Sequence, residues 1–193
     1  MKRLILLLVL LFPVVLSAAE AQYPWDLSGF VGGASLCDEA GCFGPSGIAF
    51  GGSFGRQFTD RWSFELDGVA VRTSEILPGR FDTFTGIFYI PELQRKRFWG
   101  GFTFLLSVAK IGDKSNLFVA LGAVLAYEHQ DQLVPEGVFA PDKTLGLKGG
   151  VSGGAGMNLW FSENWGIRPE FRFHGVASPL SGMRYTGGLM YRF

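Results

Sequence analysis

The sequence predicts an all-β fold, an up-and-down antiparallel transmembrane β-barrel of eight strands, and three observations support this prediction. Apolar and polar residues alternate over many short segments, as expected for strands whose two faces meet different surroundings. Aromatic residues are abundant and the chain contains 28 glycines, a composition that favours aromatic-rich strands over helices. Tight turns alternate with longer loops along most of the chain, which is the connection pattern of a membrane-spanning barrel.

The N-terminus has the features of a secretory signal peptide. Two basic residues precede the apolar run Leu4–Leu16, and Ala19-Glu20-Ala21 fits a cleavage pattern of small residues. The apolar run is too short for a spanning helix, which needs about 20 residues. We therefore expect a signal peptide over residues 1–21 and one barrel domain over residues 22–193.

Eight segments show the alternation of strands, and a ninth is ambiguous. The expected strands are Trp25–Leu36, Ser46–Phe58, Trp62–Thr73, Arg97–Ile111, Leu117–Glu128, Thr144–Phe161, Trp165–Ala177 and Met183–Phe193. Phe84–Ile90 could be a further strand, but an odd number would make the last strand run in the wrong direction. We therefore interpret it as an extended external loop or hairpin, with a ten-stranded barrel as the alternative.

The connections between these strands differ in length. Tight turns are expected at Thr59, Gly112 and Ser162, a short loop at Ser178–Gly182, and longer loops at Cys37–Pro45, Ser74–Lys96 and His129–Lys143. In transmembrane barrels the short turns face the periplasm and the longer loops face outward. The three longer loops are therefore the candidate binding surface.

The last segment carries the most specific signal. Tyr185, Leu189, Tyr191 and Phe193 share one face of the strand, and the chain stops at Phe193 without a polar tail. This ending resembles the C-terminal strand of bacterial outer-membrane β-barrels. The resemblance implies a location in the bacterial outer membrane, contact with its lipid and lipopolysaccharide, and recognition of these four residues by the barrel-assembly machinery.

An internal repeat extends the resemblance to the whole mature chain. Phe58-Thr-Asp-Arg-Trp-Ser-Phe-Glu-Leu66 and Phe161-Ser-Glu-Asn-Trp-Gly-Ile-Arg-Pro169 share one plan: an aromatic residue, a polar turn, a Trp and an alternating strand. Aromatic residues beside a tight turn suit an interfacial girdle. The plan is similar to that of small outer-membrane barrels, such as the transmembrane domain of outer membrane protein A and the opacity-type adhesins.

The segment after Trp165 decides which face of each strand points inward. One face carries Trp165, Ile167, Phe171 and Phe173, whereas the other is charged. A lipid-facing Arg costs about 2–4 kcal/mol near the midplane, so the charged face is expected to point into the lumen. The lumen charge network predicted in this way consists of Glu65, Asp67, Lys148, Arg168, Glu170, Arg172, Arg184 and Arg192. Acids and arginines should pair across the narrow lumen and plug it; the alternative is a gated, narrow pore.

Other candidate chemistry is sparse. Two His and two Cys in no cluster predict neither a metal site nor a cofactor. Cys37 and Cys42 lie in one loop of an oxidising compartment, so we predict a disulfide between them, the alternative being two reduced thiols. His174 and Ser178 are weak catalytic candidates through a resemblance to lipid A deacylases. In that family the His and Ser are two apart and face lipid, whereas here they are four apart and His174 points inward.

These observations predict a monomeric outer-membrane barrel that is not an enzyme. Its role would be structural, adhesive or recognition-type, exerted through the external loops. A narrow channel is the second hypothesis and a lipid A-modifying hydrolase the third. The near-neutral charge gives no sign of nucleic-acid binding, so we expect no nucleic acid as a partner. The external ligand is not identified by the sequence.

Overall fold

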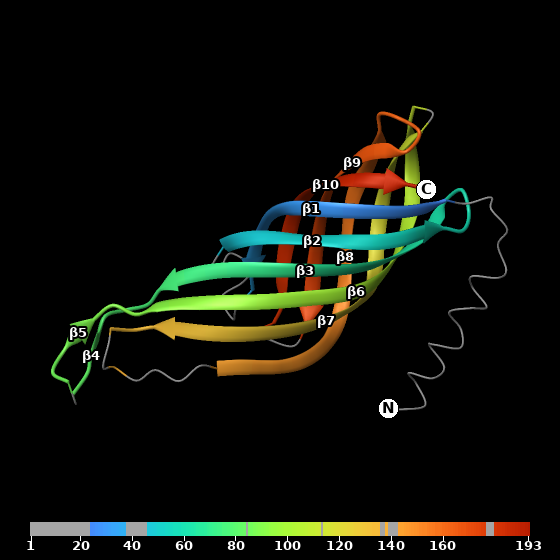
Figure 1. Ribbon diagram of the computed structural model, residues 1–193. Coiled ribbons are helices and arrows are strands. Elements are labelled where there is room, and N and C mark those ends of the chain that lie inside the picture. Colours follow the sequence, from blue (N-terminus) through green and yellow to red (C-terminus); the bar gives the residue numbers. More distant parts are fainter. Residues whose placement is uncertain are drawn as a thin grey trace.

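The computed structural model describes residues 24–37, 46–83, 85–112, 114–135, 138, 143–176 and 180–193. They form a closed barrel with a small hairpin beyond one end (Figure 1). The strands are β1 Trp25–Leu36, β2 Ser46–Gln57, β3 Trp62–Ile76, β4 Arg80–Phe81, β5 Phe88–Tyr89, β6 Glu92–Ile111, β7 Ser115–Leu133, β8 Lys143–Trp160, β9 Trp165–Val176 and β10 Gly182–Arg192. The predicted signal peptide lies outside the described residues and remains a prediction.

The barrel consists of eight strands in the order β1-β10-β9-β8-β7-β6-β3-β2, and every neighbouring pair is antiparallel. It closes where the first strand pairs with the last, from Asp26 opposite Arg192 to Leu36 opposite Gly182. Reciprocal hydrogen bonds between Trp25 and Phe193, of 3.1 and 3.0 Å, end this seam. The predicted eight-stranded up-and-down barrel is therefore confirmed.

Alternation along the strands separates an apolar outside from a largely polar inside. Outward side chains such as Val31, Phe50, Leu121, Phe171 and Tyr185 are exposed, whereas their sequence neighbours point inward. The register is fixed because a slip by one residue would turn the charges of β9 toward lipid. Within the described residues, no helix is long and apolar enough to cross a membrane.

The two copies of the internal repeat fold into the same turn. The backbone amides of Phe58 and Thr59 donate to the Trp62 carbonyl, at 3.1 and 3.2 Å. Their counterparts Phe161 and Ser162 donate to the Trp165 carbonyl, both at 3.2 Å. In each turn the hydroxyl group also accepts the Trp amide, at 2.9 Å from Thr59 and 2.8 Å from Ser162. The side chains of the four aromatic residues in the two turns, Phe58, Trp62, Phe161 and Trp165, are exposed and form a girdle at the tight-turn end.

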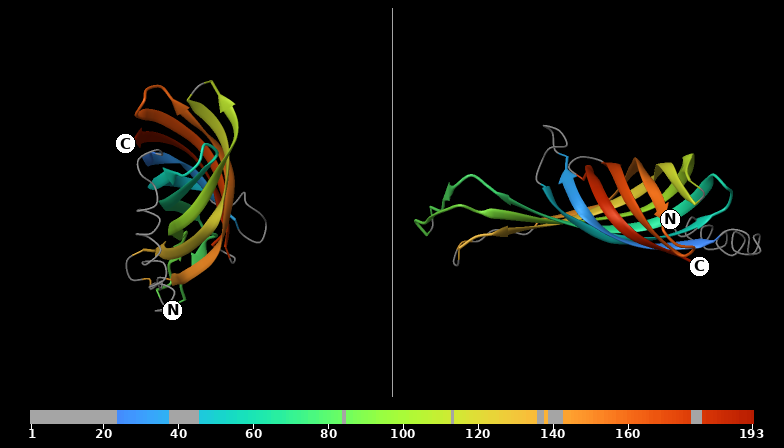
Figure 2. Two further views of the ribbon diagram at one scale, coloured as in Figure 1. Left: turned by 90° about the vertical axis from the view of Figure 1, so that its right-hand side faces the viewer. Right: turned by 90° about the horizontal axis from the view of Figure 1, so that it is seen from above.

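Three strands run past the barrel wall at the other end, which corrects the predicted loop bounds. The pairing of β2 with β3 ends at Gly47 opposite Thr73, but β3 and β6 stay paired to Ile76 opposite Glu92, and β6 and β7 to Glu92 opposite Leu133. Polar side chains interact across these strands and prolong the ladder into water. We call these ends of β3, β6 and β7, with the hairpin at their tip, the extension (Figures 1 and 2).

The segment before β6 is not a barrel strand. Among the strands that the structure describes, β4 pairs only with β5, Arg80 opposite Tyr89 and Phe81 opposite Phe88, in a separate two-stranded sheet. This confirms the interpretation of the segment as a hairpin outside the barrel wall and excludes the ten-stranded barrel; that the hairpin faces the cell exterior remains a prediction. The turn is closed by hydrogen bonds from Asp82 N to Ile87 O, at 2.9 Å, and from Gly86 N to Asp82 O, at 2.8 Å. Gly86 has a φ of 70°, which glycine adopts without strain.

Inside the barrel, side chains are arranged in layers along the axis. A charged layer occupies the middle, between β3 and the facing strands β9 and β10. Toward the extension it is followed by an apolar cluster of Ala34, Leu36, Ala49, Val69, Val71, Trp99, Val124, Ala126, Val176 and Leu180. A smaller cluster of Leu105, Phe118 and Ala120 lies nearer the tight turns. These layers are the setting of the candidate site.

Candidate functional site

The centre of the lumen is crossed by a network of three acids and three arginines. We call it the lumen network; its members are Glu65, Asp67, Arg168, Glu170, Arg172 and Arg184. Arg172 is at its centre, with nitrogen–oxygen distances of 2.6 Å to Glu65, 2.9 Å to Glu170 and 3.4 Å to Asp67. Arg184 contacts Asp67 at 2.9 Å and Glu170 at 3.1 Å. Arg168 pairs with Glu65.

The network is balanced in charge and shielded from solvent. Three carboxylates face three guanidinium groups, and no member is more than 8 % exposed. Neutral neighbours supply further hydrogen bonds: Arg172 donates to Thr103 Oγ1 at 3.0 Å, and Arg168 donates to Asn158 Oδ1 at 2.8 Å. Buried charges are tolerated when they are paired and hydrogen-bonded in this way.

Aromatic rings extend the surroundings of the arginines. The guanidinium carbon of Arg184 lies 4.7 Å from the centre of the Phe30 ring, and that of Arg168 lies 5.4 Å from the Phe118 ring. Such cation–π contacts are most favourable where water is excluded. Arg168 and Arg184 are thereby held between acids and ring faces, which fixes their position in the lumen.

Two members of the predicted charge network lie apart from its centre. Arg192 is at the tight-turn end, where it donates to Asp26 at 2.9 Å and stacks over Trp160 at 4.0 Å. Lys148 is exposed at the rim, beyond the point where the pairing of β8 with β9 ends at Gly150. It forms no ion pair with a described residue. Its position in the alternation of β8 is that of a lumen-facing residue, but β9 does not pair with β8 at this level, so the barrel wall beside it is incomplete.

One buried ion pair was missed from the sequence. Arg97 and Glu128 face each other across β6 and β7, and both side chains are fully buried. Arg97 Nε lies 2.5 Å from Glu128 Oε2, and Arg97 Nη1 donates to the Ser181 carbonyl at 2.8 Å. Arg97 precedes the in-phase Phe98 by one residue, so its inward direction was available from the sequence. Its partner was not.

Of the two weak catalytic candidates, the structure describes His174 alone. His174 is 1 % exposed and stacks on Trp99 inside the lumen, with ring centres 4.5 Å apart. Neither of its ring nitrogens has a hydrogen-bond partner among the described residues. Ser178 lies outside the described residues. In the part of the chain that the structure describes, no group of three His, Cys, Asp or Glu side chains could hold a metal ion.

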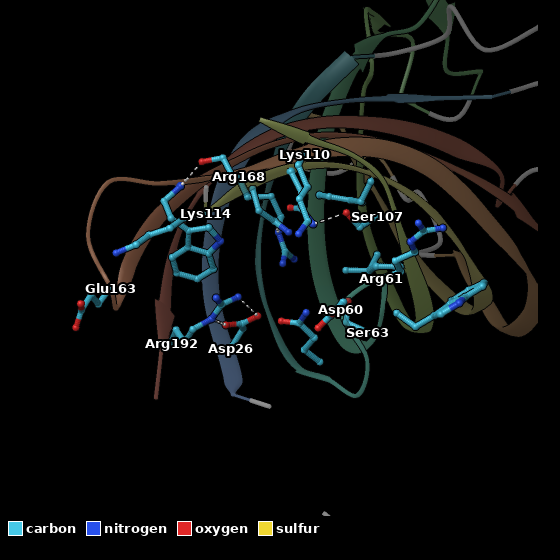
Figure 3. A pocket seen from close by; sticks show the side chains of 18 of the residues that line it. Asp26, Asp60, Arg61, Ser63, Ser107, Lys110, Lys114, Glu163, Arg168 and Arg192 are labelled. Atoms are coloured by element: carbon cyan, nitrogen blue, oxygen red, sulfur yellow. Dashed lines mark hydrogen bonds and ion pairs between the residues drawn. The ribbon is translucent and has the colours of Figure 1, made fainter. Parts of the chain in front are cut away.

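The tight-turn end of the lumen is hollow. A cavity of about 530 Å³ lies among the ends of the strands, with Lys110, Lys114, Arg61 and Asp60 around it (Figure 3). It reaches inward as far as Arg168 of the lumen network. Figure 3 shows that polar side chains surround it from several strands, including the hydrogen-bonded Asp26 and Arg192. The hollow therefore ends at Arg168, at the edge of the lumen network.

Polar interactions in the extension are far more exposed than those in the lumen. Arg95 contacts Glu75 at 3.1 Å, and Asp131 accepts from Lys96 at 2.6 Å. The hydrogen bond from Lys96 lowers the pKa of the Asp131 carboxyl, and His129 also contributes through its charge. Hydrogen bonds from Ser74 and Gln94 lower the pKa of Glu92. These pairs hold the strands of the extension together in water.

The remaining predicted site residues lie at the wall and the rim. Tyr185, Leu189, Tyr191 and Phe193 all point outward and are exposed, as side chains in contact with lipid would be. Cys37 is buried at the end of β1. Cys42 lies outside the described residues, so the disulfide remains a prediction.

No protein-family model and no curated protein matches the chain. Among solved structures it is similar to Ail, the attachment invasion locus protein of Yersinia pestis, at 14% identity and a TM-score of 0.53, covering 89% of this chain and 98% of that one. Neisserial surface protein A gives 10% identity and a TM-score of 0.61, with 88% and 97% covered. The N-terminal β-barrel domain of Pseudomonas aeruginosa OprF gives 13% and 0.54, with 88% and 97% covered. These similarities establish the fold: the chain is an eight-stranded barrel of the bacterial outer-membrane type.

Proposed function

We propose that this chain is a docking protein of the bacterial outer membrane, which binds an external partner through its extension and long loops while its lumen stays closed to solutes. The observation that carries this proposal is the lumen network, whose six charged side chains span the barrel from β3 to β9 and β10. A barrel that does not conduct leaves its projecting end as the part that can act on something outside the cell.

The layering of the interior supports a closed lumen. An eight-stranded barrel is just wide enough for side chains to fill it. The network occupies the middle, and the apolar cluster around Trp99 and Leu36 lies against it on the side of the extension. To pass through the lumen, a solute would have to separate the ion pairs of the lumen network. It would also have to displace the layer of packed apolar side chains.

The shape of the long-loop end supports docking. β3, β6 and β7 carry paired backbone beyond the wall and present the β4–β5 hairpin far from the barrel (Figure 2). The neighbour Ail is the attachment invasion locus protein of Yersinia pestis, and its structure is also known in complex with the heparin analogue sucrose octasulfate. The other long loops, Cys37–Pro45 and the part of His129–Lys143 beyond β7, lie largely outside the described residues.

The proposal includes the surroundings of the barrel. Outer-membrane lipid and lipopolysaccharide would contact the apolar outer face, and the barrel-assembly machinery would read Tyr185, Leu189, Tyr191 and Phe193. We propose a monomer, since the seam between β1 and β10 closes the barrel within one chain. A catalytic role is not proposed, because His174 is buried on the lumen side of the wall, away from lipid.

A narrow channel is the second candidate, and the hollow at the tight-turn end favours it. The cavity of about 530 Å³ leads to Arg168, so among the described residues the lumen network and the apolar cluster separate it from the outside. Movement of these groups would join the hollow to the external medium.

Conductance in a planar bilayer tests the closed lumen. The wild-type protein should give no single-channel steps, and Glu65→Gln or Arg168→Met should introduce them by loosening the network. Wild-type steps that disappear in either variant would establish the channel instead.

Adhesion of cells that display the barrel tests docking. A variant in which a tight turn joins Ile76 directly to Glu92 should lose adhesion to host cells. Its fold can be checked by the mobility of unheated against boiled protein on a gel. Adhesion at the wild-type level in a folded variant of this kind would refute the docking function of the hairpin.

A further inference from the structure

The tip of the extension carries an apolar surface that no described residue covers. Phe81 is 63 % exposed and Phe88 is 67 % exposed, and the set is completed by Ile76, Ile87 and Ile90, all exposed. We call these five side chains the apolar tip. They lie beyond the barrel on the side of the long loops (Figure 1), so the apolar belt of the protein's own membrane does not explain them. Exposed apolar clusters of this kind mark interaction sites.

The apolar tip is held in a defined shape. Phe81 and Phe88 face each other across the hairpin, and the Phe88 ring packs onto Gly79, where a Cβ atom would come within 2.4 Å of the ring. At the base of the hairpin, Leu77 N donates to the Pro91 carbonyl at 2.9 Å. The apolar side chains are therefore presented by paired backbone, and binding would cost little ordering entropy.

Apolar side chains lie on both faces of the hairpin, although Ile87 shares its face with the Arg80–Tyr89 pair, and this distinguishes the kinds of partner. Side chains alternate between the two faces of a strand, so Phe88 and Ile90 lie on one face and Ile87 lies on the other. A groove in a folded protein covers one face of a two-stranded hairpin and leaves the other in water. A lipid surface surrounds the hairpin and removes both faces from water together.

The polar residues of the hairpin suit the boundary between lipid and water. Arg80 lies opposite Tyr89, is exposed, and belongs to no ion pair among the described residues. Tyr and Arg place an apolar body in lipid and a polar end among headgroups. The backbone at the outer edges of β4 and β5 is paired with no other described strand, which limits insertion to the interface, since unpaired backbone is costly in hydrocarbon. Asp82 of the same hairpin is half-buried and accepts the Thr85 amide at 3.4 Å, so the exposed guanidinium of Arg80 is the charge best placed to meet an anionic surface.

We infer that the β4–β5 hairpin docks on an anionic phospholipid surface facing the cell and inserts the apolar tip into its headgroup boundary. This inference rests on the proposed docking function and identifies its partner as a lipid surface. Insertion needs no pocket and no sequence-specific contact, and its strength comes from burial of the apolar tip with a contribution from Arg80.

Vesicle flotation tests the inference with the full-length protein held in nanodiscs of phosphatidylcholine. The wild-type protein should float with vesicles that contain phosphatidylserine, and more weakly with vesicles of phosphatidylcholine alone. The double substitution Phe81→Ser/Phe88→Ser should weaken flotation by at least about tenfold. Leu133→Ser removes an exposed apolar side chain from the end of β7, off the hairpin, and is the matched control that should float like the wild type.

A second variant guards against loss of the hairpin's shape. Arg80→Glu keeps every member of the apolar tip, and it should remove the preference for phosphatidylserine while weak flotation remains. No flotation of the wild type, or equal flotation of the Phe81/Phe88 variant, would overturn the inference. If the hairpin is needed for adhesion to cells but wild-type protein does not float, the partner is a protein and the docking function survives. If the hairpin is needed for neither, both proposals fail.

Discussion

The lumen network and the extension both contain pairs of acidic and basic side chains, but one set is buried and the other is exposed to water. In the lumen, Arg172 and Glu65 are almost completely buried and each contacts more than one partner. In the extension, Lys96 and Asp131 are 53 % and 21 % exposed at the side chain, and their contact is open to water and salt. Removing one partner of a buried pair strands a charge in a poor solvent, whereas an exposed partner is simply solvated. We therefore expect the lumen charges to be fixed by the fold and the extension charges to be replaceable.

The largest effect is expected at the centre of the network. Arg172→Met would leave Glu65, Asp67 and Glu170 with a deficit of positive charge, and we expect it to destabilise the barrel by about 3–5 kcal/mol. Urea unfolding in lipid vesicles measures this difference. The same substitution in the extension, Arg95→Met, is the control. Similar losses for the two variants would mean that burial does not separate the two regions.

An intermediate effect is expected where the two regions meet. Glu128 pairs with Arg97 inside the barrel, but it also accepts from Gln130 at 2.5 Å near the start of the extension. Glu128→Gln keeps the shape and removes the charge, so we expect a loss of about 2 kcal/mol. The same unfolding assay places this variant between Arg172→Met and Arg95→Met. A loss of stability as large as that of Arg172→Met would mean that charges at the rim are as sensitive to substitution as charges in the lumen.

The smallest effect is expected in the extension. Lys96→Ala removes the strongest cause of the lowered Asp131 pKa, so that pKa should rise toward its ordinary value of 3.8. Because the pKa of Asp131 is lower in the folded protein, its charged carboxylate stabilises the folded extension at pH values above the ordinary pKa. This stabilisation is lost as the pH falls through the lowered pKa. Carboxyl titration by NMR at acidic pH checks the shift. The urea midpoint at neutral pH should not move; a clear drop would show that this exposed pair supports the barrel.

Much of the barrel could be predicted because its strands alternate cleanly. The first strand was predicted with the observed bounds, Trp25–Leu36, and the register of β9 followed from the cost of placing its charges in lipid. The ends of β3, β6 and β7 were predicted too short. Beyond the membrane both faces of a strand meet water, so the alternation that marks a strand disappears while the backbone pairing continues.

The pairing of Arg97 with Glu128 could not be predicted, for a local reason. Near the turn, Lys110 lies opposite Asn116, and counting back at this register places Arg97 opposite His129. A bulge at Val108 shifts the register by one residue, which brings Glu128 into position instead. Bulges depend on how neighbouring strands bend, and no residue in this stretch signals one. A similar irregularity near Ala126 shifts the pairing of β8 beside Lys148.

The seam between the first and last strands also governs how the barrel can form. Its partners, such as Asp26 and Arg192, are 166 residues apart in the sequence, so the entropy of closing that loop is lost before any seam contact forms. A chain that ended before β10 would leave the edges of β1 and β9 with unpaired backbone groups, which are costly in hydrocarbon. Closure of the barrel is therefore expected to be the slow and final step of folding. It requires β10, which is synthesised after the other barrel strands.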